Sequence, residues 1–156
     1  MESMNAIERF IKRAFDFSLA LISLLVFSPL IALIALLIKW EDPKGDVVYK
    51  QERIGYKGRP FILYKFRSMR MDAEANNSPQ LFTDGDSRLT KVGAFIRAHH
   101  LDEFPQLWNV IKGEMSFVGP RPERQFFIDQ IMEHNPDYTR LYAVRPGLFS
   151  YATLYN

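Results

Sequence analysis

The sequence predicts an α+β protein, in which an apolar N-terminal helix precedes a mostly helical domain with a small β-hairpin. Three observations predict this class. Residues 17–38 contain no charged side chain, residues 47–69 hold two β-prone runs around a turn, and apolar side chains recur at helical spacing over residues 89–131. We therefore divide the chain into an apolar helical segment, residues 1–40, and a second domain, residues 41–156.

The composition excludes several classes of protein. The chain has 156 residues, 20 Lys plus Arg, 18 Asp plus Glu and no Cys. This length suits one domain with a true core, and the apolar content is too high for a disordered chain. The absence of cysteine excludes disulfides, a thiolate zinc site and a cysteine nucleophile. A net charge of +2 argues against nucleic-acid binding through bulk charge.

The uncharged run at residues 17–38 is long enough to cross a membrane as a helix, at about 1.5 Å per residue. A cleavable signal peptide fits less well, because its apolar region usually has about 7–15 residues. In addition, no small-residue cleavage pattern precedes Lys39. A buried helix of a soluble protein fits poorly too, because no face of the run is polar.

Ser28-Pro29 lies near the middle of this run. Proline removes a backbone donor and crowds the carbonyl of Leu25, which predicts a kink, and the hydroxyl of Ser28 can satisfy a freed backbone group. Two topologies remain open: a kinked helix that crosses the membrane, and a re-entrant helix that enters one leaflet and returns. Cations flank both ends of the run, which favours the cytoplasmic side for both: Arg9, Lys12, Arg13, Lys39 and Lys44.

The predicted hairpin is strongly basic. Its only acid is Glu52, against seven cations: Lys50, Arg53, Lys57, Arg59, Lys65, Arg67 and Arg70. A solvated strand face would explain such a run, but its position directly after an apolar helix also fits a membrane-surface patch or a phosphate cradle.

Three helices are expected beyond a polar surface loop at residues 72–88. The first contains Leu89, Val92, Phe95 and Ile96. The second begins near Asp102 as N-cap, ends at Gly113 and buries a stripe of Phe104, Leu107, Trp108 and Ile111. The third spans residues 124–134, with an apolar face of Phe127, Ile128, Ile131 and Met132.

Asp102 and Glu103 are the candidate catalytic carboxylates. An N-cap role is the simplest explanation of the pair, but Arg97 lies upstream and Arg121 is held between two prolines downstream. A carboxylate kept ionised by a helix N-terminus and by cations is a competent nucleophile or metal ligand, and arginines bind diphosphates bidentately. The set predicts phosphoryl chemistry at a lipid interface. Adjacent histidines rarely chelate one ion, so His99-His100 is interpreted as a surface or pocket pair.

Several motifs together carry a family resemblance. They are Lys12-Arg13 with Asp16, Ser28-Pro29, Gln51-Glu52-Arg53-Ile54-Gly55, Lys65-Phe66-Arg67-Ser68-Met69, Asp86 with Arg88 and Thr90, residues 101–110, residues 112–116, Val118-Gly119-Pro120-Arg121-Pro122-Glu123 and Arg145-Pro146-Gly147. In this order the chain resembles the bacterial sugar transferases, or monotopic phosphoglycosyl transferases, in their smallest form.

The resemblance implies a re-entrant helix broken at Ser28-Pro29, followed by a cytoplasmic domain at the cytoplasmic face of the cytoplasmic membrane. It implies a UDP-sugar, polyprenol (undecaprenyl) phosphate and membrane lipids as partners. Asp102 would be the nucleophile, forming a phosphosugar-enzyme and releasing UMP, with Glu103 completing the dyad. Mg²⁺ would be the cofactor, with Asp102 as a ligand. The residues expected to bind substrate phosphates are Arg97, Arg121, Lys65 and Arg67.

An alternative from another class is a non-catalytic membrane module whose basic hairpin binds anionic lipids or a partner glycosyltransferase. Further expected partners are downstream glycosyltransferases and a second copy of the chain, but not nucleic acid. The residues after Pro146-Gly147 depart from the Thr-Gly that the family usually has there. Since family chains normally continue further, we expect this C-terminus to be shortened relative to the family.

Overall fold

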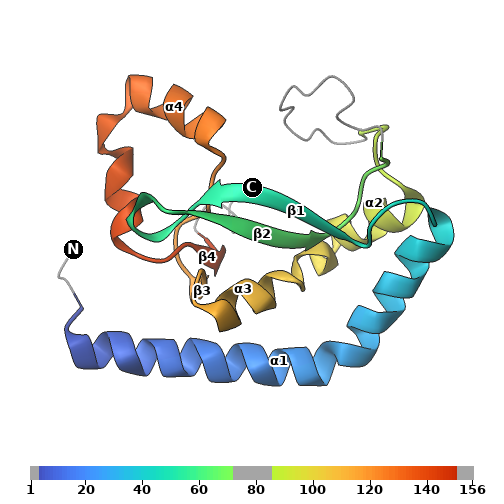
Figure 1. The fold of residues 1–156 in the computed structure, drawn as a ribbon, viewed down its shortest axis with the longest axis horizontal. Helices are drawn as coiled ribbons and strands as arrows, with labels where there is room; N and C mark the ends of the chain where they lie inside the picture. The colour runs from blue at the N-terminus through green and yellow to red at the C-terminus, as the bar shows by residue number, and fades with distance from the viewer. Residues whose placement is uncertain (1–3, 72–85, 151–156) are drawn as a thin grey trace.

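A computed structural model describes residues 4–71 and 86–150, in which a long bent helix lies along one side of a small α+β domain (Figure 1). This arrangement confirms the predicted mixture of helix and sheet, with a long apolar N-terminal helix and a small antiparallel hairpin. The helices are α1 (Ala6–Glu41), α2 (Lys91–Ala98), α3 (Gln106–Lys112) and α4 (Gln125–His134). The strands are β1 (Val48–Ile54), β2 (Pro60–Phe66), β3 (Ser116–Val118) and β4 (Gly147–Phe149). Short 3-10 segments are η1 (Tyr56–Gly58), η2 (Leu101–Glu103) and η3 (Pro136–Ala143).

Helix α1 runs for 36 residues and begins with a capping box between Asn5 and Glu8. It changes direction in its second half (Figure 1). Pro29 lies inside the helix, and the hydroxyl of Ser28 donates a hydrogen bond of 2.8 Å to the carbonyl oxygen of Leu25. The predicted kink and its hydroxyl partner are thus confirmed, but the chain stays helical through Ser28-Pro29. The break expected there is a bend, because the hydroxyl satisfies the carbonyl that proline crowds.

The predicted hairpin is also confirmed. Strands β1 and β2 are antiparallel, with a register that runs from Val48 opposite Phe66 to Ile54 opposite Pro60. The turn between them uses left-handed backbone at Lys57 (φ 59°) and Gly58 (φ 69°). Leu63 and Phe66 point from β2 into the core.

The core has two clusters, and α1 contributes to both. Its first arm packs Ala20 against a cluster from β2, α3 and the following turn: Leu63, Leu107, Val110 and Met115. Its second arm packs Ile34 and Ile38 against Phe66 and Ile96. The opposite side of α1 is apolar and open: only 11% of its most apolar 18-residue window is buried. Helix α1 is therefore long and apolar enough to enter a membrane, and it lacks the burial of a core helix.

The helix expected from Asp102 begins later, so this prediction is wrong. His100 adopts a left-handed backbone (φ 55°), Asp102 lies in η2, and α3 starts at Gln106. Proline at position 105 has no backbone N–H to donate, and the regular helix starts directly after it. The predicted end of the helix is confirmed, since Gly113 caps it with φ 85°.

The predicted core stripe is wrong at Trp108, whose side chain is 53% exposed. The side chain buried beside it is Asn109, at 0% exposure. Its amide accepts a hydrogen bond from the Tyr64 backbone N–H (3.1 Å) and donates to the Ile62 carbonyl (2.7 Å). Because its amide is hydrogen-bonded, Asn109 can lie in the core at modest cost. It links α3 to β2, a contact that the apolar pattern of the sequence does not predict.

Strands β3 and β4 form a small parallel pair that the sequence did not reveal, with Ser116 opposite Gly147 and Val118 opposite Phe149. They are too short to show a period. The predicted helix at residues 124–134 is confirmed as α4, with Ile128 buried. Of the loop expected at residues 72–88, residues 72–85 lie outside the described residues.

Gly93 provides a test of the packing of α2. A Cβ atom at this position would lie 1.9 Å from the carbonyl oxygen of Ser68. Gly→Ala inside a helix normally stabilises by about 1 kcal/mol. Here we expect Gly93→Ala to lower the free energy of unfolding by about 1–3 kcal/mol, because backbone must move. Thermal unfolding in detergent measures it, with the exposed Ala94→Ser as control. A stabilised Gly93→Ala would contradict this packing.

Candidate active site

The two candidate carboxylates lie in η2, between α2 and α3 and against β2. Asp102 is only 4% exposed. Glu103 forms an ion pair with Lys65, with 2.9 Å between the carboxylate Oε1 and Nζ. Lys65 comes from β2, so the hairpin brings a cation to the dyad.

Burial is the dominant influence on Asp102. Desolvation raises the pKa of its carboxyl above the ordinary value, and the neighbouring charge of Glu103 adds to this, while Lys65 and Arg97 act in the opposite direction. Of the two influences expected to keep this carboxylate ionised, the cations Lys65 and Arg97 are beside it, whereas the start of a helix is not. The cations are present, but α3 begins at Gln106 and burial outweighs them.

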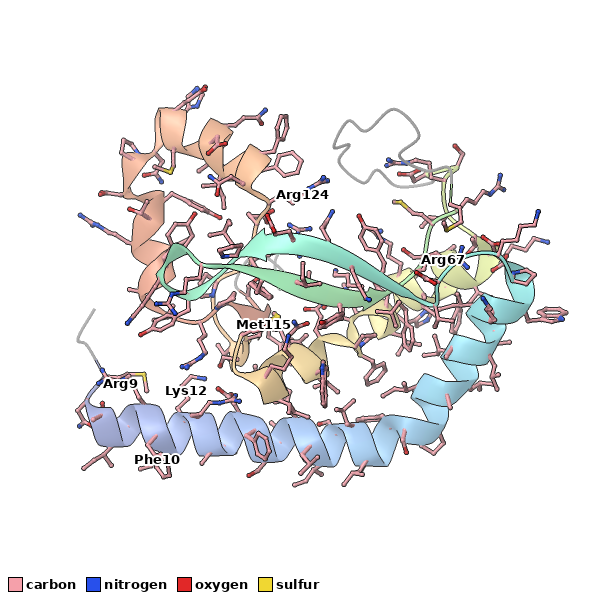
Figure 2. All side chains as sticks on the ribbon, in the orientation of Figure 1. Arg9, Phe10, Lys12, Arg67, Met115 and Arg124 are labelled. Carbon is pink, nitrogen blue, oxygen red and sulfur yellow. The ribbon has the colours of Figure 1, made fainter. Side chains whose placement is uncertain are left out.

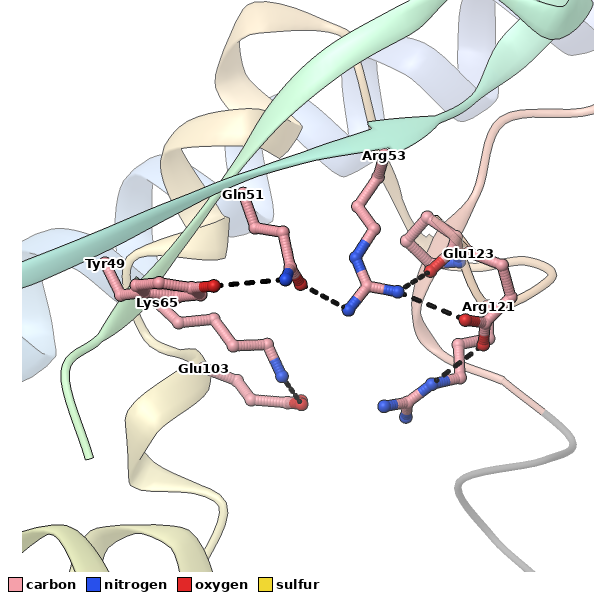
Figure 3. Close-up of polar contacts among 8 residues, drawn as sticks. Tyr49, Gln51, Arg53, Lys65, Glu103, Arg121 and Glu123 are labelled. Atoms are coloured by element: carbon pink, nitrogen blue, oxygen red, sulfur yellow. Dashed lines mark hydrogen bonds and ion pairs between the residues drawn. The ribbon is translucent and has the colours of Figure 1, made fainter. Parts of the chain in front are cut away.

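A shallow pocket beside Glu103 opens to solvent. Ten residues line it: Arg53, Leu63, Lys65, Glu103, Gln106, Arg121, Pro122, Gly147, Leu148 and Ser150. Three of the ten are cations, which suits a polyanionic ligand. Figure 3 shows these cations converging from β1, β2 and the turn that holds Arg121.

A chain of polar contacts holds the pocket's guanidinium groups (Figure 3). Arg53 donates from Nη1 to Oε2 of Glu123 (3.1 Å) and from Nη2 to Oε1 of Gln51 (2.6 Å). Gln51 donates in turn to the hydroxyl of Tyr49 (3.1 Å). The other oxygen of Glu123 lies 3.4 Å from Nε of Arg121. Glu123 therefore orients two guanidinium groups at once.

Arg97 lies in the same charged neighbourhood. It is half-buried in α2, and burial lowers its pKa, while the charges of Asp102 and Asp86 favour its cationic form and that of Arg121 opposes it. Asp86 is paired with Arg88, which lowers the pKa of the Asp86 carboxyl to about 2. The structure thus brings Arg97, Lys65 and the dyad together, and Arg121 lies in the pocket beside Glu103.

Arg67 lies elsewhere. It is 7% exposed, and its Nη1 and Nη2 donate to the side chain (2.5 Å) and the carbonyl (2.9 Å) of Asp42. These bonds tie the end of β2 to the end of α1. Arg67 is not among the residues that line the pocket, whereas Arg53, which was expected only as one of the seven cations of the hairpin, lines it. Both arginines come from the basic hairpin. They differ in their acidic partners, which are distant in sequence: Asp42 for Arg67 and Glu123 for Arg53.

The structure also places two other residue pairs that the sequence singled out, His99-His100 and Ser28-Pro29. His99 is exposed and its ring lies 2.8 Å from the carbonyl of Phe95, as expected of a surface residue. Ser28 and Pro29 follow Phe27, whose ring centroid lies 5.2 Å from that of Phe104. The bend of α1 thus contacts the residue after Glu103.

No group of three or more His, Cys, Asp or Glu side chains gathers among residues 4–71 and 86–150. A metal cage made of protein alone is therefore absent from this part of the chain. Mg²⁺ commonly uses only one or two carboxylates, completed by substrate phosphates and water. Asp102 and Glu103, which are neighbours in the sequence, carry the type of ligand that such a shared site uses.

The fold and the site together define a membrane-associated domain with a carboxylate dyad beside a cationic pocket. The model of the family described as "Bacterial sugar transferase" matches residues 7–156, and the chain belongs to this family.

Three relatives illustrate the range of similar proteins. The UDP-N-acetylgalactosamine-undecaprenyl-phosphate N-acetylgalactosaminephosphotransferase of Aeromonas hydrophila is 46% identical over 148 residues, 95% of this chain and 34% of its own. A Bacillus subtilis protein, named as a candidate undecaprenyl-phosphate N-acetylgalactosaminyl 1-phosphate transferase, is 47% identical over 83% of this chain and 72% of its own. The UDP-glucose:undecaprenyl-phosphate glucose-1-phosphate transferase of Escherichia coli is 39% identical over 97% of this chain and 32% of its own. The chain thus spans about a third of two of these relatives.

The burial of Asp102 predicts a gain in stability when its charge is removed. The folded state holds the Asp102 proton more tightly than the unfolded chain, so wild-type stability falls as pH rises from the unfolded to the folded pKa. We expect Asp102→Asn to have a higher melting temperature at neutral pH. The difference should narrow as pH falls below the ordinary pKa of aspartate.

Asp86→Asn is the matched control, because the lowered pKa of Asp86 gives the opposite sign. It should reduce the melting temperature at neutral pH. Thermal unfolding across a pH series measures both variants. An Asp102→Asn variant less stable than wild type at neutral pH would contradict the assigned balance.

Proposed function

We propose that the chain is a phosphoglycosyl transferase. It moves a sugar 1-phosphate from a UDP-sugar to undecaprenyl phosphate, the first step of surface glycan assembly. The observation that carries the proposal is a buried carboxylate, Asp102, next to a pocket whose cations come from three separate segments. The names of the relatives support the two substrate classes.

In the first half-reaction, an oxygen of Asp102 attacks the phosphorus that bears the sugar. The bond from that phosphorus to the bridging oxygen of UMP breaks, and UMP leaves with the electron pair. Arg121 and Arg97 supply positive charge to the phosphoryl oxygens. Glu103 holds Lys65 at the dyad through their 2.9 Å ion pair.

In the second half-reaction, a phosphate oxygen of undecaprenyl phosphate attacks the same phosphorus. The bond to Asp102 breaks, which restores the carboxylate and yields the lipid diphosphosugar. A covalent intermediate lets the enzyme handle a water-soluble donor and a membrane-bound acceptor in turn. Mg²⁺, held by Asp102 and Glu103 together with the substrate, would offset phosphate charge when bound.

We further propose that α1 is re-entrant and that both its ends lie on the cytoplasmic face. A helix of 36 residues, at about 1.5 Å per residue, is longer than a hydrocarbon core of about 30 Å. Both of its ends nevertheless contact the same small domain. Near the N-terminus Asp16 accepts from Ser116 (2.8 Å), and at the C-terminus Glu41 accepts from the backbone N–H of Val92 (2.8 Å). A domain that touches both ends supports their lying on one side of the bilayer.

The proposed chemistry predicts a covalent adduct. Purified protein mixed with a panel of UDP-sugars, without lipid acceptor, should release UMP and gain the mass of one phosphosugar on Asp102. Asp102→Asn should abolish both, whereas Asp129→Asn, on the exposed surface of α4, should leave both unchanged. Mass spectrometry and a UMP assay measure the outcome. A complete panel without adduct or UMP would reject the proposal in favour of the non-catalytic module.

The raised pKa of Asp102 predicts the pH dependence of adduct formation. Only the ionised carboxylate attacks, so the rate should fall as pH drops through a pKa above the ordinary aspartate value. Lys65 lowers this pKa. Lys65→Met should therefore move the acid limb to higher pH, in addition to slowing the reaction. Initial rates of UMP release across pH measure the limb, and a limb that moves to lower pH would refute the assignment.

A further inference from the structure

The first arm of α1 lies alongside α3, the helix that follows the dyad, and runs antiparallel to it. Arg13 donates from Nη1 to the carbonyl of Val110 and from Nη2 to that of Ile111, each at 2.5 Å. These carbonyls belong to the last turn of α3, where a cation is favourably placed. The guanidinium of Arg13, in α1, thus caps the C-terminal end of α3.

The remaining contacts along this interface are mainly apolar. Ala20 and Leu24 pack in the cluster that contains Leu107 and Val110. Further along, the ring of Phe27 meets that of Phe104 at 5.2 Å, directly after Glu103. The interface therefore extends from the C-terminal end of α3 to the residue next to the dyad.

Polar contacts reinforce the same end of the arm. Asp16 accepts from the Ser116 hydroxyl (2.8 Å) and the Phe117 backbone N–H (3.3 Å), and Lys12 donates to both Asp16 and Ser116. Figure 2 shows Lys12 pointing from α1 toward the domain and Phe10 pointing away from it. The second arm is held separately, beyond the bend, by Glu41 and Asp42.

We propose that Arg13 is a positioning residue that, together with the bonds of Asp16 to Ser116 and Phe117, fixes the axial register of α1 on α3 and thereby sets the depth of Asp102 relative to the membrane surface. The effect on catalysis rests on the proposed function. Apolar contacts have no preferred direction, and lipid on the opposite face of α1 gives no register. Hydrogen bonds are directional, and a guanidinium fork that spans two consecutive carbonyls fits one register only.

The two substrates should sense this register differently. A shift of α1 by one residue moves it by about 1.5 Å along its axis, and misplacement by about 1 Å can slow a reaction by on the order of 100-fold. The UDP-sugar arrives from water, so its attack by Asp102 does not depend on membrane depth. The lipid phosphate is held at the headgroup level, so its attack does.

The first experiment measures depth without using activity. The chain has two tryptophans, and Trp40→Phe leaves Trp108 of α3, which is 53% exposed, as a single fluorophore. In this Trp40→Phe background, the variant is bound to phosphatidylglycerol vesicles that carry bromine at one acyl position at a time. Bromine quenches tryptophan fluorescence at short range, so the position that quenches Trp108 most strongly reports its depth in the bilayer. Arg13→Met should shift the depth profile. Arg13→Lys, which keeps the charge but loses the fork, should shift it in the same direction.

Arg9→Met is the matched control. It removes a cation from the same flank, but within residues 4–71 and 86–150 Arg9 makes only a local bond, to the carbonyl of Met4 (2.6 Å). Its depth profile should match that of wild type. This control separates register from the general effect of flanking charge on membrane topology.

The second experiment separates the half-reactions. UMP release without acceptor measures the first, and transfer to undecaprenyl phosphate at saturating UDP-sugar measures the second. Arg13→Met should leave the first rate near that of wild type and lower the second by on the order of 10- to 100-fold, with a raised KM for the lipid. Arg9→Met should retain both.

An unchanged Trp108 depth in Arg13→Met overturns the proposal, and so does an equal loss of both half-reactions, which would indicate a merely structural role. A shifted depth with a selective loss of the second half-reaction supports it. If wild type releases no UMP from any UDP-sugar, the proposed function fails instead, and the depth profile alone decides the register.

Discussion

The packing of α1 on the domain is the constraint on which the rest of the structure depends. Both core clusters need side chains from this helix, Ala20 in one and Ile34 and Ile38 in the other. Without it, the buried faces of α3 and α2 would be open to solvent, and burial of apolar surface is the main source of stability in so small a domain. Helix α1 is therefore part of the fold of the domain, although it is long and apolar enough to enter a membrane.

The buried and half-buried charged side chains lie where α1 meets the domain and at the pocket, and most of them are paired. At the ends of α1, buried or half-buried ions pair with groups of the domain, as Arg67 does with Asp42 and Asp16 with Ser116. At the pocket, cations and carboxylates are again paired, through Glu103 and Glu123. Asp102 differs because burial dominates its environment and raises its pKa. Two adjacent carboxylates thus have different surroundings, which is how active sites assign different roles to like groups.

Sequence patterns predicted the elements that have a period or a strong local cause. The hairpin and the helices around Ile96 and Ile128 follow from apolar spacing, and the bend of α1 follows from Pro29. The patterns failed where tertiary contacts decide. Asn109 is buried because the edge of β2 offers it partners, and Trp108 is exposed because α3 turns that face away from the core. The pairing of β3 with β4 joins segments that are distant in sequence and too short to predict.

The basic hairpin shows why the composition of a motif does not assign roles within it. Lys65, Arg67 and Arg53 lie on the same two strands and look equivalent in sequence. Each meets a carboxylate from a different segment: Glu103 beside the dyad, Asp42 at the end of α1, and Glu123 beyond α3. The position of this carboxylate decides whether the cation faces the pocket or links the hairpin to α1. Ion pairs of this kind depend on burial and geometry, so two of these three cations line the pocket and the third links the end of β2 to the end of α1.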